Sequence, residues 1–144
     1  MTKIAINGFG RIGRIFFRQV YGEASRVIDG ERSRTTTKRN FKIVAINDLG
    51  DLENLAYLLK YDTVYGRFPH EVKAEGGKLK VNGTPVEYLQ IKDPTQLPWK
   101  KLGIDVVVEA TGVFESFEKA RVHLDQGAKR VVLTAPAKDA DGTL

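Results

Sequence analysis

The sequence predicts an α/β fold, a doubly wound and mostly parallel sheet with an inserted antiparallel meander. Short apolar segments typical of buried strands alternate with segments whose apolar residues recur at helical spacing. Between residues 70 and 92, apolar and polar residues alternate instead, and Gly-Gly and Asn-Gly pairs separate the runs, as in antiparallel hairpins. The chain has 144 residues, 42% of them hydrophobic, which is enough for one core, and we assign residues 1–144 to one domain.

The first strand and helix come directly at the start of the chain. Residues 3–7 are short and apolar, as in a buried parallel strand. From Arg11, apolar residues recur at helical spacing, so a helix is expected to run from there to near Gly22. Residues at about 23–41 are polar and turn-rich, and we interpret them as a basic loop insertion.

A second strand, a second helix and the meander follow. The strand is expected over residues 42–48. Asp51 is the expected N-cap of a helix whose apolar face holds Leu52, Leu55, Ala56 and Leu59. The Asn82-Gly83 pair predicts a tight hairpin in the meander, because both turn positions need positive φ.

The last third returns to the parallel pattern after a proline-bounded turn. A buried strand is expected over residues 104–112, and one more apolar strand begins near Arg130. Between them, residues 114–128 predict a helix with Phe117, Ala120 and Leu124 facing inward.

Composition excludes several classes of function. The chain has no cysteine, which rules out disulfides, thiolate metal sites and a cysteine nucleophile within these residues. No His, Cys or carboxylate group has metal-ligand spacing, so no metal site is expected. The two histidines, His70 and His123, are expected at the surface. No segment has the length of a membrane span, and strand-like sequence from Lys3 leaves no room for a signal peptide, so we expect a cytoplasmic protein with no membrane contact.

The positive charge is concentrated in the basic insertion. The net charge is +5, and Arg26–Asn40 alone holds five Lys or Arg against two acids. Such a segment can contact nucleic acid, but it lacks interleaved aromatic residues on which bases would stack. A loop in contact with solvent is therefore the preferred interpretation, and nucleic acid is not the expected partner.

A glycine motif, "NGFGRIG", joins the first strand to the first helix. Gly8, Gly10 and Gly13 form G-x-G-x-x-G. In a Rossmann-type dinucleotide-binding unit, the first glycine permits the tight turn, the second lets the backbone approach the pyrophosphate, and the third lets the helix pack closely. The helix N-terminus then offers N–H groups to the phosphates.

A dinucleotide site of this type also needs an acid that binds the adenosine ribose. It is expected about 20 residues after the glycines, at the end of the second strand. Asp29 and Glu31 fit the spacing better, but Asp48 ends a strand, and we choose Asp48. Two other strand ends, at Thr111-Gly112 and at Thr134, are expected at the same edge of the sheet.

Several long motifs resemble the glyceraldehyde-3-phosphate dehydrogenase family. They are "KIAINGFGRIGR", "VAIND", "LLKYDTVYGRF" and "EATGVFESFEKARVHLDQGAKRVVLTAPAKD", in that order, from Lys3 to Asp139. The resemblance covers nearly the whole chain, and only the basic insertion interrupts it. It implies the NAD-binding domain of that family, with NAD as the cofactor.

The resemblance also implies roles for residues on the adenosine side. Arg11 and Ile12 would meet the pyrophosphate through their backbone, and Asp48 would hold the adenosine ribose. Lys92 stands in "QIKDP", where the family often has an arginine beside the adenine.

On the other side of the cofactor, Thr111, Gly112 and Thr134 would line the nicotinamide. Asn7 and Phe9 would contact the dinucleotide from the glycine loop. The resemblance therefore implies cofactor contacts at the glycine loop and at the strand ends marked by Asp48, Thr111-Gly112 and Thr134.

The activity implied by the resemblance belongs to a longer protein. In the family, a cysteine thiolate attacks a small phosphorylated aldehyde, hydride passes to NAD, and inorganic phosphate releases the acyl product, in a homotetramer. The catalytic cysteine and the catalytic domain are absent from this chain, so we expect no catalytic residue here and no activity of the chain alone. Two alternatives stay open: the NAD-binding domain of the related erythrose-4-phosphate dehydrogenase, and a non-catalytic nucleotide- or RNA-binding module.

Overall fold

A computed structural model describes residues 1–22 and 41–139 of the chain. Its strands are β1 Thr2–Asn7, β2 Phe41–Asn47, β3 Tyr61–Asp62, β4 Gly66–Arg67, β5 Val72–Glu75, β6 Lys78–Val81, β7 Thr84–Leu89, β8 Val106–Glu109 and β9 Arg130–Leu133. Its helices are α1 Arg11–Gly22, α2 Leu52–Lys60, the 3-10 helix η1 Pro94–Gln96, α3 Trp99–Leu102, α4 Phe117–Ala120 and α5 Val122–Asp125. Most of the predicted basic insertion lies outside the described residues, but Phe41, the last residue assigned to it, already belongs to β2.

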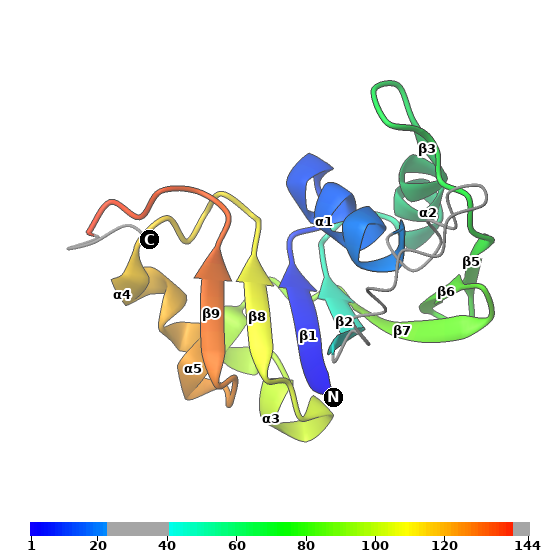
Figure 1. Cartoon of the computed structure of the whole chain (residues 1–144). Helices are drawn as coiled ribbons and strands as arrows, with labels where there is room; N and C mark the ends of the chain where they lie inside the picture. The colour runs from blue at the N-terminus through cyan, green and yellow to red at the C-terminus, as the bar shows by residue number, and fades with distance from the viewer. Residues whose placement is uncertain (23–40, 140–144) are drawn as a thin grey trace, which may run out of the picture.

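The main sheet has seven strands in the order β5-β6-β7-β2-β1-β8-β9 (Figure 1). In the part of the sheet that runs in the order β7, β2, β1, β8 and β9, neighbouring strands are parallel. At the other end, β5, β6 and β7 form an antiparallel meander. The meander is thus part of the main sheet, because β7 pairs with β6 on one side and with β2 on the other. Asn82 and Gly83 have φ of 50° and 78°, as the Asn-Gly hairpin requires. The prediction of a doubly wound α/β fold with an inserted meander is confirmed.

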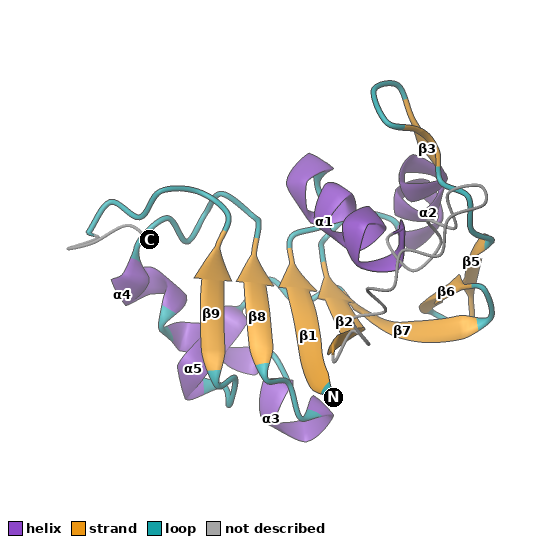
Figure 2. Ribbon diagram, viewed as in Figure 1, coloured by secondary structure: helices purple, strands orange, loops and turns teal. Residues whose placement is uncertain are grey.

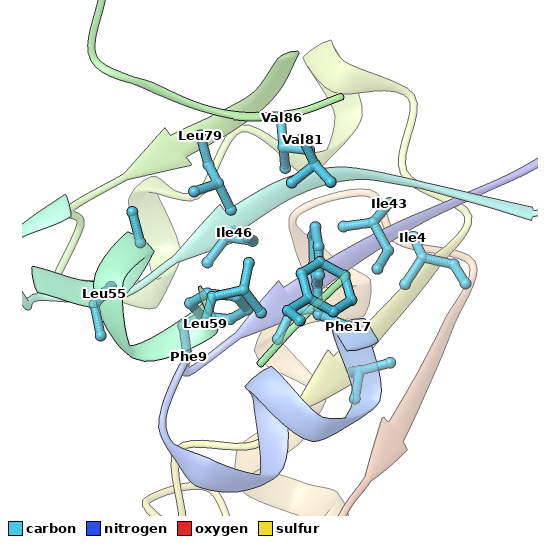
Figure 3. Close-up of a cluster of buried hydrophobic side chains, with 14 residues drawn as sticks. Ile4, Phe9, Phe17, Ile43, Ile46, Leu55, Leu59, Leu79, Val81 and Val86 are labelled. Carbon is cyan, nitrogen blue, oxygen red and sulfur yellow. The ribbon is translucent and has the colours of Figure 1, made fainter. Parts of the chain in front are cut away.

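Helices cover both faces of the parallel strands. On one face, Phe17 of α1 and Leu55 and Leu59 of α2 pack on Ile43 and Ile46 of the sheet (Figure 3). This arrangement bears out the apolar face predicted for α2, where Asp51 accepts the N–H of Asn54 at 2.9 Å as the N-cap.

The second face carries a smaller core. Ala5 of β1 and Val107 of β8 pack there against Leu97, Trp99 and Ile104. Leu97 and Trp99 belong to the segment predicted as a proline-bounded turn, which instead contains η1 and α3.

A β-bulge lies between the first two strands. Ile4 pairs with Ile43, but Ala5 pairs with Ala45, so Val44 is an extra residue in β2. The bulge lets Ile43 and Ile46 share one face although they are separated by two residues rather than one.

The predicted helix over residues 114–128 is shorter and interrupted. It consists of α4 and α5, with Arg121 between them. Ala120 is buried as expected, but Phe117 and Leu124 are 53% and 42% exposed, so that part of the prediction is wrong. His123 is buried instead.

The loops after β1, β8 and β9 leave the sheet at the same edge (Figure 2). The chain first builds the sheet from β1 through β2 toward β7, and then returns to place β8 on the other side of β1. This reversal is a topological switch point, which is where open α/β sheets bind ligands beyond the carboxyl ends of their strands. The fold thus predicts a site beside Asn7 and Glu109, the last residues of β1 and β8.

Candidate functional site at the strand ends

The three glycines of the loop after β1 have different surroundings. Gly8 has φ +94°, and a Cβ there would lie 2.7 Å from backbone atoms of Ala110 and Thr111. A Cβ on Gly13 would lie 2.2 Å from the carbonyl oxygen of Gly8. A Cβ on Gly10 would meet nothing within 4 Å, and Gly10 lines a pocket. The first and third glycines therefore permit close packing, while the second leaves the backbone open to a ligand.

Helix α1 begins directly after Gly10, whose carbonyl accepts the N–H of Arg14 at 3.0 Å. The N–H groups of Arg11, Ile12 and Gly13 lie in the first turn, where an α-helix provides no acceptors of its own. Arg11 and Ile12 are exposed. Together with the helix dipole, these N–H groups suit an anionic ligand such as a phosphate.

Asp48 follows β2 directly, and both oxygens of its carboxylate are held. Oδ2 accepts the N–H of Phe9 at 2.7 Å, and Oδ1 accepts the N–H of Gly50 at 2.8 Å. The ring of Phe9 is buried edge-on against Phe17, 5.7 Å between centroids. Phe9 thus ties the glycine loop to Asp48 through its backbone. Each carboxylate oxygen retains a lone pair for a further donor.

A chain of hydrogen bonds between buried side chains joins the ends of β2, β1 and β8. The Asn47 amide donates to Asn7 Oδ1 at 2.8 Å, and the Asn7 amide donates to Glu109 Oε2 at 2.7 Å. His123 Nε2 lies 2.7 Å from the same Glu109 oxygen. The indole N–H of Trp99 donates to His123 Nδ1 at 3.1 Å. The network fixes the three strand ends relative to one another and anchors them to α3 and α5.

The expectation of a surface histidine at position 123 is wrong. His123 is 0% exposed. Because the indole of Trp99 can only donate, Nδ1 of His123 carries no proton, and the neutral ring donates from Nε2 to Glu109. The charged neighbours of His123 in the sequence indicated exposure, but the carboxylate of Glu109 supplies the partner that makes burial possible. His70, by contrast, is partly exposed.

Glu109 connects this network to the pocket wall. Its Oε1 accepts the N–H of Thr111 at 2.9 Å and also the Thr111 hydroxyl. Burial opposes the charge of Glu109, but hydrogen bonds from His123, Thr111 and Asn7 outweigh it and hold the pKa of Glu109 below its usual range. The carboxylate is therefore ionised at neutral pH and fixes the orientation of Thr111.

The strand-end threonines differ in their relation to the pocket. Thr111 lines it, and the positive φ of the adjacent Gly112, +71°, turns the chain toward Val113 and Phe114, which also line it. Thr134 donates from its hydroxyl to the carbonyl of Glu109 at 3.1 Å and lies outside the lining. The structure thus brings one of the two threonines to the pocket.

The pocket has a volume of about 460 Å³ and lies between the glycine loop and the ends of β2, β7 and β8. The predicted site residues that line it are Asn7, Gly8, Gly10, Asp48, Lys92 and Thr111. The predicted residues outside the lining are Phe9, Arg11, Ile12, Gly13, Gly112 and Thr134. Half of the predicted set therefore converges on one pocket.

A larger groove, about 640 Å³, lies along β9 and is lined by residues of α4 and α5. None of the residues predicted to bind the cofactor lines it.

In the described part of the chain, no group of His, Asp or Glu has the arrangement of a metal site. Across the same residues, no helix is both long and apolar enough to cross a membrane.

Sequence reasoning missed several residues of the site. Asn47 and Glu109 each end an apolar strand with a polar side chain, and a polar residue in that position is a sequence signal for a site at the edge of the sheet. Leu97 and Phe114 line the pocket from irregular segments, for which periodicity gives no signal.

Comparison with known proteins assigns the chain to a family. Residues 2–117 match the sequence model of the family described as "Glyceraldehyde 3-phosphate dehydrogenase, NAD binding domain". The glyceraldehyde-3-phosphate dehydrogenase 1 of Streptomyces avermitilis is 46% identical over 143 residues, which are 99% of this chain and 39% of that protein. The glyceraldehyde-3-phosphate dehydrogenase of Thermotoga maritima is 46% identical over 144 residues, 100% of this chain and 39% of that protein.

A third relative, the plasmid-encoded glyceraldehyde-3-phosphate dehydrogenase of Cupriavidus necator, is 47% identical over 143 residues, 99% of this chain and 39% of that protein. The chain thus spans about two fifths of the length of these relatives. The glycine loop and the strand-end pocket lie within the part that the family model covers. The chain therefore belongs to the glyceraldehyde-3-phosphate dehydrogenase family and contains its NAD-binding domain.

Proposed function

We propose that the strand-end pocket is the NAD site and that residues 1–144 form the cofactor domain of a phosphorylating glyceraldehyde-3-phosphate dehydrogenase. The observation that carries the proposal is the hydrogen bond between Phe9 and Asp48, 2.7 Å long, which joins the glycine loop to the end of β2. This bond supports the proposal because it brings the backbone of the glycine loop and the carboxylate of Asp48 to one pocket.

The residues present fit the cofactor. A Cβ at Gly10 would project into open space at the pocket, which is where a pyrophosphate must approach the backbone. In this proposal Arg11 and Ile12 bind the pyrophosphate through first-turn N–H groups, Asp48 accepts the hydroxyls of the adenosine ribose, and Lys92 lies beside the adenine.

The nicotinamide half of the site is assigned to the end of β8. Thr111, held by Glu109, lines this side of the pocket. We place Gly112 and Thr134 beside it, and Asn7 and Phe9 at the glycine loop, as the family resemblance implies. NAD bound there would accept a hydride.

The reaction of the complete enzyme requires residues outside this chain. The chain contains no cysteine, so the aldehyde-binding nucleophile must come from elsewhere in a longer protein. We propose that this protein takes a small phosphorylated aldehyde and inorganic phosphate, acts in the cytoplasm and assembles as a homotetramer. Relatives of 46% identity named glyceraldehyde-3-phosphate dehydrogenase favour that substrate over erythrose 4-phosphate.

Calorimetric titration with NAD and NADP tests the assignment. We expect NAD to bind more tightly, because Asp48 and the absence of an arginine after it disfavour a 2′-phosphate. Asp48→Ala should weaken NAD binding by about 1–3 kcal/mol, the range for hydrogen bonds to a charged group. Asp125→Ala, an exposed acid on α5, is the matched control and should bind NAD like the wild type. Equal or tighter binding of NADP would overturn the assignment of Asp48.

A further inference from the structure

Tyr88 of β7 contacts the turn that follows Asp48. Its hydroxyl lies 3.2 Å from the carbonyl oxygen of Asp48 and closer still to that of Gly50. A phenol donates one hydrogen, so the Gly50 oxygen is its main acceptor and the Asp48 oxygen a second, weaker one. A side chain on the neighbouring strand thus reaches two of the three carbonyls between Asp48 and Gly50.

Other contacts hold the same turn to the end of β7. The backbone N–H of Asp48 donates to the carbonyl of Leu89 at 3.0 Å. The side-chain amide of Gln90 donates to the carbonyl of Gly50, also at 3.0 Å. The Gly50 carbonyl therefore receives two side-chain donors, one from the partly buried Tyr88 and one from the exposed Gln90.

The carbonyl and the N–H of Gly50 link Tyr88 to the carboxylate of Asp48. The N–H of Gly50 donates to Asp48 Oδ1 at 2.8 Å. A Cβ on Gly50 would lie 3.0 Å from the same oxygen, so the carboxylate sits directly against this residue. The N–H and the carbonyl of Gly50 belong to consecutive peptide groups joined at its Cα, so a looser carbonyl lets the turn shift and weakens one of the two hydrogen bonds that hold the Asp48 carboxylate.

We propose that Tyr88 is a positioning residue that orients the Asp48 carboxylate for the cofactor. This inference rests on the proposed role of Asp48 at the adenosine ribose. Tyr88 is not among the residues that line the pocket, so its effect on binding passes through the turn.

The protonation state of Tyr88 suits this task. Burial, together with the negative charges of Asp48 and Asp51, raises the pKa of Tyr88 to about 12. The phenol therefore keeps its proton at neutral pH and acts as a donor to the Gly50 carbonyl.

Tyr88→Phe, which removes one oxygen atom, tests the proposal. We expect the Kd of the chain for NAD, measured by calorimetry, to rise about two- to tenfold, the effect of one hydrogen bond. Gln90→Ala removes the exposed donor to the same carbonyl and should raise the Kd by a smaller factor. Tyr57→Phe, an exposed tyrosine on α2, is the control and should leave the Kd unchanged.

A double-mutant cycle separates positioning from a general structural effect. In an Asp48→Ala background, Tyr88→Phe should cause no further loss of NAD affinity. A full additional loss there, or an unchanged Kd for Tyr88→Phe alone, overturns the positioning role. If Asp48→Ala itself leaves NAD affinity unchanged, the ribose assignment fails. If Tyr88→Phe weakens NAD binding while Asp48→Ala does not, Tyr88 does not act through Asp48, and the positioning role is overturned as well.

Discussion

Glu109 and His123 form a buried pair in which Glu109 Oε2 and His123 Nε2 are 2.7 Å apart and the side chains are 2% and 0% exposed. The pair joins the end of β8 to α5 on one side and, through Asn7, to β1 on the other. Both carboxylate oxygens of Glu109 accept hydrogen bonds, and each ring nitrogen of His123 has a hydrogen-bonding partner. Removing one partner would leave a buried donor unsatisfied, which costs more than an ordinary hydrogen bond contributes.

We expect Glu109→Gln to destabilise the fold by about 1–3 kcal/mol. A glutamine has nearly the same shape, but its amide brings two hydrogens into a position surrounded by the donors of Asn7, Thr111 and His123. Urea unfolding followed by circular dichroism measures the change in the free energy of unfolding.

Glu118→Gln is the matched control, because Glu118 is an exposed glutamate on α4. It should change the free energy of unfolding by less than about 0.5 kcal/mol. Equal effects of the two substitutions would contradict the structural importance of the buried network.

The same pair predicts a specific pH dependence. The pKa of Glu109 is lowered in the folded state from its ordinary value of 4.5, so the unfolded chain binds the proton more readily. The contribution of Glu109 to stability is therefore complete above that value and is lost as the pH falls below it. Unfolding curves at successive pH values should show a steeper acid loss for the wild type than for Glu109→Gln. Parallel profiles for the two proteins would contradict it.

Two glycines of the loop should respond to alanine in opposite ways. Gly13→Ala places a Cβ 2.2 Å from the carbonyl oxygen of Gly8, so we expect a destabilisation of about 1–3 kcal/mol from overpacking. Gly10→Ala meets no protein atom within 4 Å, so it should leave stability nearly unchanged and weaken NAD binding. Thermal unfolding and calorimetric titration of both variants check this. A Gly10→Ala chain that binds NAD like the wild type would contradict the approach of the cofactor to this residue.

Much of the fold follows from local patterns in the sequence. β1, α1 and α2 were predicted because their apolar residues have a clear period, and the β6–β7 hairpin because Asn82-Gly83 requires positive φ. The bulge at Val44 was not predicted, since it depends on how β2 pairs with β1 rather than on β2 alone.

The candidate site likewise contains some residues that local sequence patterns predict and others that depend on contacts between distant segments. Gly10 and Asp48 were predictable, because a glycine motif and a strand-end acid are local features. The burial of the His123 side chain was not predictable, because its partners Glu109 and Trp99 lie 14 and 24 residues away in the sequence. The contact between Tyr88 and Gly50 likewise depends on the pairing of β7 with β2, which no short segment specifies.

The 144-residue chain alone should produce no NADH from glyceraldehyde 3-phosphate, NAD and phosphate. Hydride transfer from an aldehyde requires a thiohemiacetal-type adduct or a hydrate as donor, and a base to take the proton. No cysteine is present to form the adduct. His123 is not available as the base, because both of its ring nitrogens are committed to Glu109 and Trp99 in the core.

An absorbance assay for NADH with the purified chain tests this expectation, and the Asp48→Ala chain, purified in the same way, reports contamination. Turnover that is equal in both preparations comes from a host enzyme, because a contaminant does not depend on the cofactor site of this chain. Turnover present in the wild type and lost in Asp48→Ala would contradict the prediction. The chain would then have to supply a nucleophile other than cysteine, or a base that acts on the hydrated aldehyde, within reach of the pocket lined by Asp48 and Thr111.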